Sequence, residues 1–330
     1  MTKRKISKQQ HLRIQKLQAE RIARADKKTQ AVEDLSNLGP EQSGLLITHH
    51  GKYVDVEAED GTIYRCNIRQ HLGALIAGDQ VIWQPGPEQT GIVVALIPRL
   101  SLLWRPGFRD NIKPIAANID QIFVVLAPQP KPTFLMLDSY LAATGIANIK
   151  THLLCHKMDL LTNTSADEFA EIVSIYRNIG YQIYHTSLYQ PDAWQTLKEA
   201  LRNQNSIFVG QSGVGKSALI QYLVPKAKIE VGKLSLQQSL GAHTTVRSEL
   251  YHLPFGGNII DSPGIREFSL GHIEPHTLAK GFLEFLPYIK ACKFSNCLHR
   301  NEPDCAVINA VHQGQISQIR WQNYLSLIEK

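Results

Sequence analysis

The octapeptide Gly-Gln-Ser-Gly-Val-Gly-Lys-Ser at residues 210–217 constrains the fold of this chain more than any other feature. It matches the phosphate-binding loop, which needs a strand before it and a helix after it. The apolar run at 206–209 predicts the strand, and residues 217–224, stopped by Pro225, predict the helix. A glycine-rich surface turn, the alternative interpretation, would not need these neighbours. We therefore expect an α/β domain built on a mostly parallel sheet.

The positions of this loop have separate expected roles. The glycines let backbone N–H groups turn inward around the phosphates. The Lys216 ammonium reaches the β- and γ-phosphates, which makes Lys216 a candidate catalytic residue, and the Ser217 hydroxyl ligates Mg²⁺. The predicted nucleotide-binding residues of the loop are Gly210, Gln211, Ser212, Gly213, Val214, Gly215, Lys216 and Ser217.

A second motif, Asp-Ser-Pro-Gly, begins at Asp261, at the end of an apolar strand predicted over 258–261. Asp261 can hold the Mg²⁺ shell through water, and the Gly264 N–H can meet the γ-phosphate. Between the two motifs, residues 241–245 form a candidate first switch, in which a threonine hydroxyl would complete the Mg²⁺ coordination. Either threonine of this segment can do so, and we favour Thr245.

The residue that positions the attacking water is not obvious. Ile265 follows Gly264, where a Ras-like enzyme carries a glutamine, and an aliphatic side chain cannot orient water. Either hydrolysis is intrinsically slow and awaits a partner, or another polar residue acts. His243 is our candidate catalytic residue, and a structural role in the switch is the equal alternative.

A base-reading tetrad is expected to complete the site. The consensus Asn-Lys-x-Asp normally follows the phosphate-binding loop, but its close match here, His156-Lys157-Met158-Asp159, precedes the loop. The order of the domain is therefore predicted to be circularly permuted. Asp159 can accept two hydrogen bonds that guanine offers and adenine does not, and Lys157 can lie along the base. His156 replaces the asparagine, yet a ring nitrogen can still donate. Ser187 follows the strand predicted at 181–184, where the last loop that contacts guanine is expected.

Strands and helices alternate around these motifs, which favours a parallel sheet. Strands are predicted at 121–127, 151–155 and 181–184, and helices at 136–143, 165–178 and 191–202. Ser165 and Glu168 have the spacing of a capping box at a helix start, and Gly180 marks the end of that helix.

The C-terminal region contains Cys292, Cys297, His299 and Cys305, which suit a closed tetrahedral zinc site. Such a site would stabilise a segment whose core is too thin to fold alone. Free cysteines in a helical tail are the alternative. Because all four ligand places are filled by the protein, we expect a structural zinc. Cys66 and Cys155 lie in apolar strands and are predicted to be inert core residues.

Short strands and turns occupy the region before the nucleotide domain. Strands are predicted at 45–48, 52–56, 62–66, 80–83 and 91–97. Five short strands in so few residues favour a barrel of the oligonucleotide-binding (OB) type, with a small SH3-like barrel as the alternative.

The N-terminal tail carries the net positive charge. Residues 1–30 hold ten Lys and Arg against two acids, and the whole chain sums to +6. Such a tail is typical of disordered segments that contact RNA phosphates, and a solubilising role is the alternative. No apolar run is long enough to span a bilayer, so we expect a cytoplasmic protein.

The predicted organisation has four parts: a basic tail at 1–38, an OB-like β-barrel at 39–104, a circularly permuted α/β P-loop GTPase domain at 105–272, and a mainly helical zinc-binding domain at 273–330. These features together resemble the RsgA/YjeQ family of circularly permuted GTPases that act in maturation of the small ribosomal subunit. The likeness runs from about residue 35 to the C-terminus, and His156 departs from the asparagine usual in the family.

The resemblance implies a GTPase that binds the immature small subunit late in assembly, is stimulated by it and leaves after hydrolysis. GTP would be held by residues 156–159 and 210–218, which adds Ala218, and the four Cys/His residues would hold one Zn²⁺ per chain. The implied partners are the small subunit and its rRNA, with other assembly factors as further candidates, no membrane, and a monomeric state. Two other classes compete: an RNA-binding assembly chaperone whose nucleotide site does not hydrolyse GTP, and a metabolic P-loop kinase.

We predict that His243→Ala lowers the turnover of GTP while leaving GTP affinity nearly intact, because the side chain would act on water and not on the base or phosphates. Single-turnover hydrolysis and equilibrium binding measure the two quantities separately. An unchanged turnover rate removes His243 as the catalytic candidate.

Overall fold

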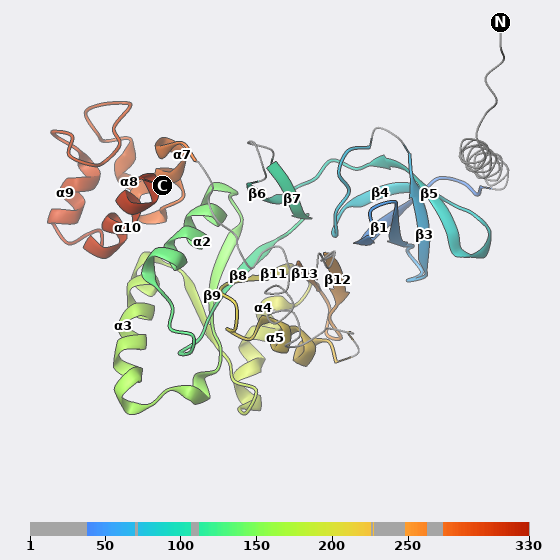
Figure 1. The fold of residues 1–330 in the computed structure, drawn as a ribbon, viewed down its shortest axis with the longest axis horizontal. Helices are drawn as coiled ribbons and strands as arrows, with labels where there is room; N and C mark the ends of the chain where they lie inside the picture. Colours follow the sequence, from blue (N-terminus) through green and yellow to red (C-terminus); the bar gives the residue numbers. More distant parts are fainter. Residues whose placement is uncertain are drawn as a thin grey trace, which may run out of the picture.

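Figure 1 shows a β-barrel and a helical C-terminal unit on either side of a central α/β domain. The structure is a computed structural model that describes residues 38–69, 72–106, 112–225, 227, 248–262 and 273–329. Residues 1–37 of the basic tail, the candidate switch at 241–245 with His243 and Thr245, and Gly264 lie outside the described residues. Among the helices that are described, none has the length and apolar character needed to cross a membrane.

The barrel is closed by five strands: β1 Gln42–His49, β2 Tyr53–Glu57, β3 Ile63–Ile68, β4 Gln80–Pro85 and β5 Thr90–Leu96. The strands pair in the order β1-β2-β3-β5-β4, and β4 returns to β1. β3 lies parallel to β5, whereas the other pairs are antiparallel. This non-sequential pairing is the Greek-key barrel of the OB fold and not an SH3-like barrel. All five predicted strands are confirmed, and Cys66 is a fully buried core residue.

The α/β domain contains five parallel strands in the order β10-β9-β8-β11-β13, with β12 added antiparallel at the edge. These strands are β8 Gln121–Leu126, β9 Lys150–Cys155, β10 Gln182–His185, β11 Asn205–Val209, β12 Glu249–His252 and β13 Asn258–Asp261. Its helices are α2 Phe134–Ile146, α3 Asn163–Ile179, α4 Gln195–Leu201 and α5 Lys216–Leu223.

Helices cover both faces of this sheet, which explains why β8 is buried along its whole length. Ile122 and Val124 pack into the core with α2 and α3, whereas Phe123 and Val125 pack into the core with α4 and α5. Successive residues of one strand thus point to opposite faces, and both faces need apolar side chains. The predicted parallel α/β architecture is confirmed.

Some predicted boundaries were wrong. Helix α3 starts at Asn163, two residues before Ser165, where the capping-box pattern predicted its start. The helix ends next to Gly180, whose φ is 111°, as predicted. The helix predicted over 191–202 begins with a 3₁₀ turn, η5 Pro191–Trp194, before α4. The side-chain pattern by itself permits several start points for a helix.

Three strands were not predicted from the sequence. Strand β12 has only four residues and gains its stability by pairing with β13 on one side and with β1 on the other. Strands β6 Leu102–Pro106 and β7 Ile112–Ala117 form a separate hairpin, and each contains a proline, which argues against a strand in a sequence pattern. β6 spans the predicted domain boundary between residues 104 and 105.

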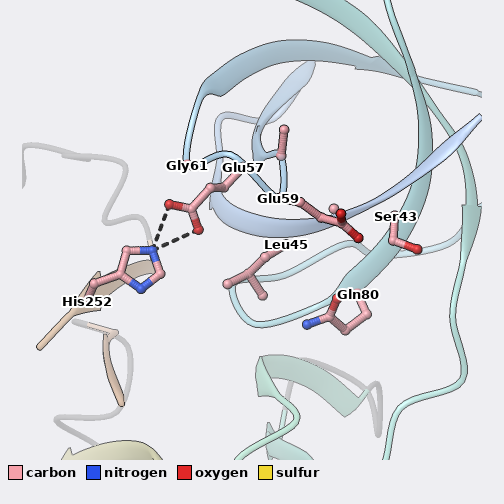
Figure 2. A pocket seen from close by; sticks show the side chains of 9 residues that line it. Ser43, Leu45, Glu57, Glu59, Gly61, Gln80 and His252 are labelled. Carbon is pink, nitrogen blue, oxygen red and sulfur yellow. Dashed lines mark hydrogen bonds and ion pairs between the residues drawn. The ribbon is translucent and has the colours of Figure 1, made fainter. Parts of the chain in front are cut away.

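The barrel joins the edge of the α/β sheet through β1 and β12. Thr48 is the partner of Glu249 in the ladder, and His252 Nε2 lies 2.8 and 2.9 Å from the two carboxylate oxygens of Glu57. Figure 2 shows the side chains of His252 and Glu57 facing each other across the junction, beside a cavity of about 490 Å³. Gly78 also brings the barrel close to β7 and β13, because a Cβ there would lie 2.3 Å from the Ala117 carbonyl oxygen and 3.0 Å from Ile260 Cδ1.

The C-terminal unit consists of α7 Pro275–Lys280, η8 Leu283–Phe285, α8 Leu286–Ile289, α9 Ala306–His312 and α10 Gln318–Ile328. It packs on α2, where Gly145 and Gly281 allow close backbone approach: a Cβ on Gly145 would lie 2.6 Å from the Gly281 carbonyl oxygen. The predicted mainly helical C-terminal part is confirmed.

A buried ion cluster joins this unit to the α/β domain. Arg320 is fully buried, donates to Asp138 of α2 at 2.5 Å, and makes a two-pronged contact with Glu284 at 2.6 and 2.9 Å. Asp138 also accepts from Tyr176 of α3 and from Asn323 of α10, each at 2.6 Å. Burial by itself would lower the pKa of Arg320, but the two carboxylates raise it well above its ordinary value.

We predict that Arg320→Met lowers the free energy of unfolding by about 3–5 kcal/mol, because Asp138 and Glu284 would stay buried without a counter-charge. Urea unfolding followed by tryptophan fluorescence measures this. The matched control is Lys131→Met, which breaks an exposed ion pair with Glu168 and should change stability by less than about 1 kcal/mol. Equal effects of the two substitutions would contradict a structural role of the cluster.

Candidate nucleotide-binding site and cysteine cluster

The phosphate-binding loop connects β11 to α5 at the carboxyl edge of the sheet. Gly210, Gly213 and Gly215 have φ values of 142°, 84° and 103°, which L side chains rarely adopt. Space is also short at two of these positions. A Cβ on Gly210 would lie 2.5 Å from the Val125 carbonyl oxygen, and one on Gly215 would lie 2.6 Å from the His156 ring. The glycines are thus required by backbone conformation and by close packing together.

Lys216 begins α5, and its ammonium bends back over the loop. Its Nζ donates to the Gly210 carbonyl oxygen at 2.6 Å and to the Gln211 carbonyl oxygen at 2.8 Å. The positive charge therefore lies among the backbone groups of the loop, next to the N-terminus of α5, where phosphates are favoured. Ser217 follows in the first turn and is partly exposed.

The tetrad lies against this loop although it comes much earlier in the chain. His156 continues from β9, with its N–H donating to the Leu126 carbonyl oxygen at 2.8 Å. Lys157 adopts a left-handed conformation with φ 57° and opens the short 3₁₀ turn Met158–Leu160. Its Nζ donates to the Gly213 carbonyl oxygen at 2.7 Å and to that of Gln129 at 3.3 Å. One side chain thus joins the tetrad to the phosphate-binding loop.

Ser187 orients the carboxylate of Asp159. The Ser187 hydroxyl donates to Asp159 Oδ1 and accepts the Tyr189 N–H at 3.1 Å, while the Ser187 carbonyl accepts Trp194 Nε1–H at 2.8 Å. Asp159 itself is exposed, whereas Ser187 is buried. The sequence placed Ser187 here only by its position after a predicted strand, and the structure brings it into contact with the tetrad.

His156 is buried and neutral at physiological pH. Burial, followed by the charge of Lys157, lowers the pKa of the imidazole to about 4. Its Nδ1 lies 3.0 Å from the Thr186 hydroxyl, and that oxygen is buried as well. Sequence reasoning missed Thr186. The signal that was available is its place directly before Ser187, at the end of a strand parallel to the one that carries the tetrad.

Asp261 ends β13, which lies parallel to β11 with Ile260 opposite Ile207. The carboxyl ends of the two strands share one edge of the sheet, so Asp261 and the phosphate-binding loop face the same crevice. Ser262 follows, and its hydroxyl accepts from Ser248 at 2.8 Å, which ties this segment to the start of β12.

The cysteine cluster is the second candidate site. The four ligand atoms of Cys292, Cys297, His299 and Cys305 lie within 4.8 Å of one another. The Sγ atoms of Cys292 and Cys305 are 3.9 Å apart, and His299 Nδ1 lies 3.6 and 3.4 Å from them. Tetrahedral zinc with ordinary bond lengths gives about 3.8 Å between two sulfurs and about 3.6 Å between sulfur and nitrogen. The cluster can therefore hold a metal ion.

The loop that presents these ligands is held by bonds of its own. Glu302 accepts the backbone N–H groups of Leu298 and Arg300, each at 2.8 Å. From α10, Trp321 Nε1–H donates to the His299 carbonyl oxygen at 2.8 Å and the Tyr324 hydroxyl donates to that of Leu298 at 2.9 Å. These contacts fix the left-handed backbone of His299, whose φ is 58°.

The fold and this site define a circularly permuted GTPase, with the base-reading tetrad encoded before the phosphate-binding loop. The family model of the RsgA GTPase matches residues 96–271. Two relatives, both called "Small ribosomal subunit biogenesis GTPase RsgA", are those of Pseudomonas savastanoi pv. phaseolicola, 43% identical over 99% of this chain and 98% of the relative, and of Hahella chejuensis, 45% identical over 100% and 97%. The chain belongs to the RsgA GTPase family.

Solved structures agree with this assignment. YjeQ from Thermotoga maritima matches with a TM-score of 0.74 and 28% identity, over 88% of this chain and 98% of that one. YloQ, described as a circularly permuted GTPase, matches with a TM-score of 0.70 and 27% identity, over 88% and 94%. The family, the permuted fold and GTP hydrolysis as the reaction are confirmed, and the P-loop kinase is excluded.

Proposed function

We propose that this GTPase binds the immature small ribosomal subunit in the cytoplasm and assists its late maturation. The subunit stimulates hydrolysis, and release follows loss of the γ-phosphate. The names of relatives that match over nearly the full length support the biological role. The observation that supports binding of a guanine nucleotide is the hydrogen bond from Lys157 to the Gly213 carbonyl oxygen. This bond joins the base-reading tetrad to the phosphate-binding loop, the two halves of the site that are separated in the sequence.

The roles of the site residues follow from their positions. Lys216 exchanges its two loop carbonyls for β- and γ-phosphate oxygens, and the loop N–H groups enclose the phosphates. Asp159, oriented by Ser187, accepts the guanine N–H groups. Ser217 and Asp261 would hold Mg²⁺, and the ion would neutralise charge on the phosphate oxygens. Further nucleotide contacts are assigned to His156, Lys157, Met158, Ala218 and Gly264, with Thr245 on Mg²⁺ and His243 on the attacking water.

Contact with ribosomal RNA is assigned to the basic tail, the barrel and the C-terminal unit, in a monomeric protein. The domain limits 39–104, 105–272 and 273–330 belong to this proposal. Its physical basis is that phosphate contacts by Lys and Arg supply affinity, while a barrel of the OB type offers a surface for nucleic acid. The cysteine cluster is assigned one structural Zn²⁺, because its donor set and spacings suit that ion.

We predict that small ribosomal subunits accelerate phosphate release from GTP and not from ATP. Lys216→Ala should remove this stimulated activity, since the side chain neutralises charge on the transferred phosphoryl group. Lys150→Ala is the matched control. Lys150 is the first residue of β9, so it lies at the amino ends of the parallel strands, away from the phosphate-binding loop at their carboxyl ends. Stimulation by the subunit with ATP as well as with GTP contradicts the guanine assignment, and an unchanged rate of GTP hydrolysis in the presence of the subunit contradicts the proposed stimulation.

Metal analysis should find about one zinc per purified chain. Cys305→Ser should release this zinc and lower the thermal stability of the C-terminal unit, because metal binding and folding of such a loop are coupled. Cys66→Ala, in the barrel core, is the matched cysteine control and should keep the zinc. Full zinc content in Cys305→Ser would show that the four residues do not form the metal site.

A further inference from the structure

The imidazole of His156 touches three segments that build the nucleotide site. It belongs to the tetrad, its Nδ1 lies 3.0 Å from the Thr186 hydroxyl at the end of β10, and its ring edge packs on Gly215 of the phosphate-binding loop. A Cβ placed on Gly215 would lie 2.6 Å from Cδ2 and 3.0 Å from Nε2 of this ring, so the imidazole fills the space between the loops.

We propose that His156 and Thr186 form a positioning pair that holds the base-reading segment against the phosphate-binding loop and so sets the selectivity for guanine. This inference rests on the proposed role of Asp159 in reading the base. The His156 ring holds the site together, and Thr186, which lies outside the tetrad, is its hydrogen-bond partner.

The backbone of Thr186 also links the end of β10 to the end of β9 and to the tetrad. Its N–H donates to the Cys155 carbonyl oxygen at 2.8 Å, and its carbonyl oxygen accepts the Met158 N–H at 3.3 Å. The side-chain bond to His156 adds a third link between the ends of β9 and β10. Ser187 comes next in the chain and bonds Asp159, so a displacement of Thr186 would move the carboxylate that faces the base.

The imidazole suits this place because it is uncharged. It is 1% exposed and lies next to the Lys157 ammonium, so a second positive charge would be costly. The Trp194 ring lies edge-on to the His156 ring, with 6.3 Å between the two ring centroids. Its Nε1–H donates to the Ser187 carbonyl oxygen at 2.8 Å. His156 and Trp194 thus each bond a residue of the segment that holds Thr186 and Ser187.

Removing either partner leaves the other without its hydrogen bond in a buried place. His156→Ala also opens a cavity beside Gly215, while Thr186→Val keeps the volume and deletes only the hydroxyl. Because Asp159 recognises the exocyclic amine of guanine, loss of its placement should reduce the preference for GDP over inosine diphosphate, which lacks that amine. A residue that only stabilises the fold would not change this ratio.

The experiment measures binding of GDP, inosine diphosphate and ADP to the full chain by equilibrium titration, together with thermal stability. His156→Ala and Thr186→Val should each weaken GDP binding roughly five- to tenfold and lower the GDP to inosine diphosphate ratio several-fold, as expected for one or two lost buried hydrogen bonds. The double variant should be little worse than either single one, since the pair acts as a unit. His156→Asn should recover most of the ratio.

The control is His152→Ala, which removes another buried histidine, from the strand β9 that leads into His156. His152 is 2% exposed and bonds Gln121 at 3.1 Å, away from the nucleotide loops, so its loss should lower stability and leave the ratio unchanged. The positioning pair is overturned if His156→Ala and Thr186→Val keep the wild-type ratio. If the wild-type chain does not prefer GDP over ADP, the guanine site itself is wrong, and the pair is overturned with it.

Discussion

The nucleotide site depends on the meeting of two loops at the carboxyl edge of one parallel sheet. Lys157 donates to the Gly213 carbonyl oxygen, and His156 packs on Gly215, so the base-reading tetrad and the phosphate-binding loop form one surface. Strand order in space creates this contact, because β9 and β11 both lie beside β8. The order of the motifs along the chain is therefore free to change, provided that the strands keep their neighbours.

Two further units are packed around the nucleotide domain (Figure 1). Glu249 of β12 pairs with Asp261 on one side and with Thr48 of the barrel on the other, so only one strand separates the barrel from the strand that carries the Mg²⁺-binding candidate. On the opposite side, Arg320 joins the C-terminal helices to α2 through a fully buried charge cluster. The barrel is thus one strand away from β13, and the C-terminal unit is packed on a helix of the nucleotide domain.

Much of this arrangement was predictable from local patterns. The phosphate-binding loop, the five barrel strands and the clustered cysteines have spacings that follow from local geometry. The start of α3, the hairpin of β6 and β7, and β12 were not predictable in this way. β12 has only four residues, and it is a strand because β1 and β13 both supply hydrogen-bond partners. Thr186 carries no motif, and its importance comes from a neighbour on another strand.

By itself, the sequence determined the family to which the motifs belong, and it named the candidate residues for holding phosphates, reading guanine and binding a metal. The tertiary structure alone decided how separated segments combine, including the closure of the barrel through β1 and β4, the contact of Ser187 with Asp159, and the burial of His156. The physical reason is that backbone conformation and ligand type act over a few neighbouring residues. Hydrogen-bond partners and burial instead depend on residues that only folding brings together.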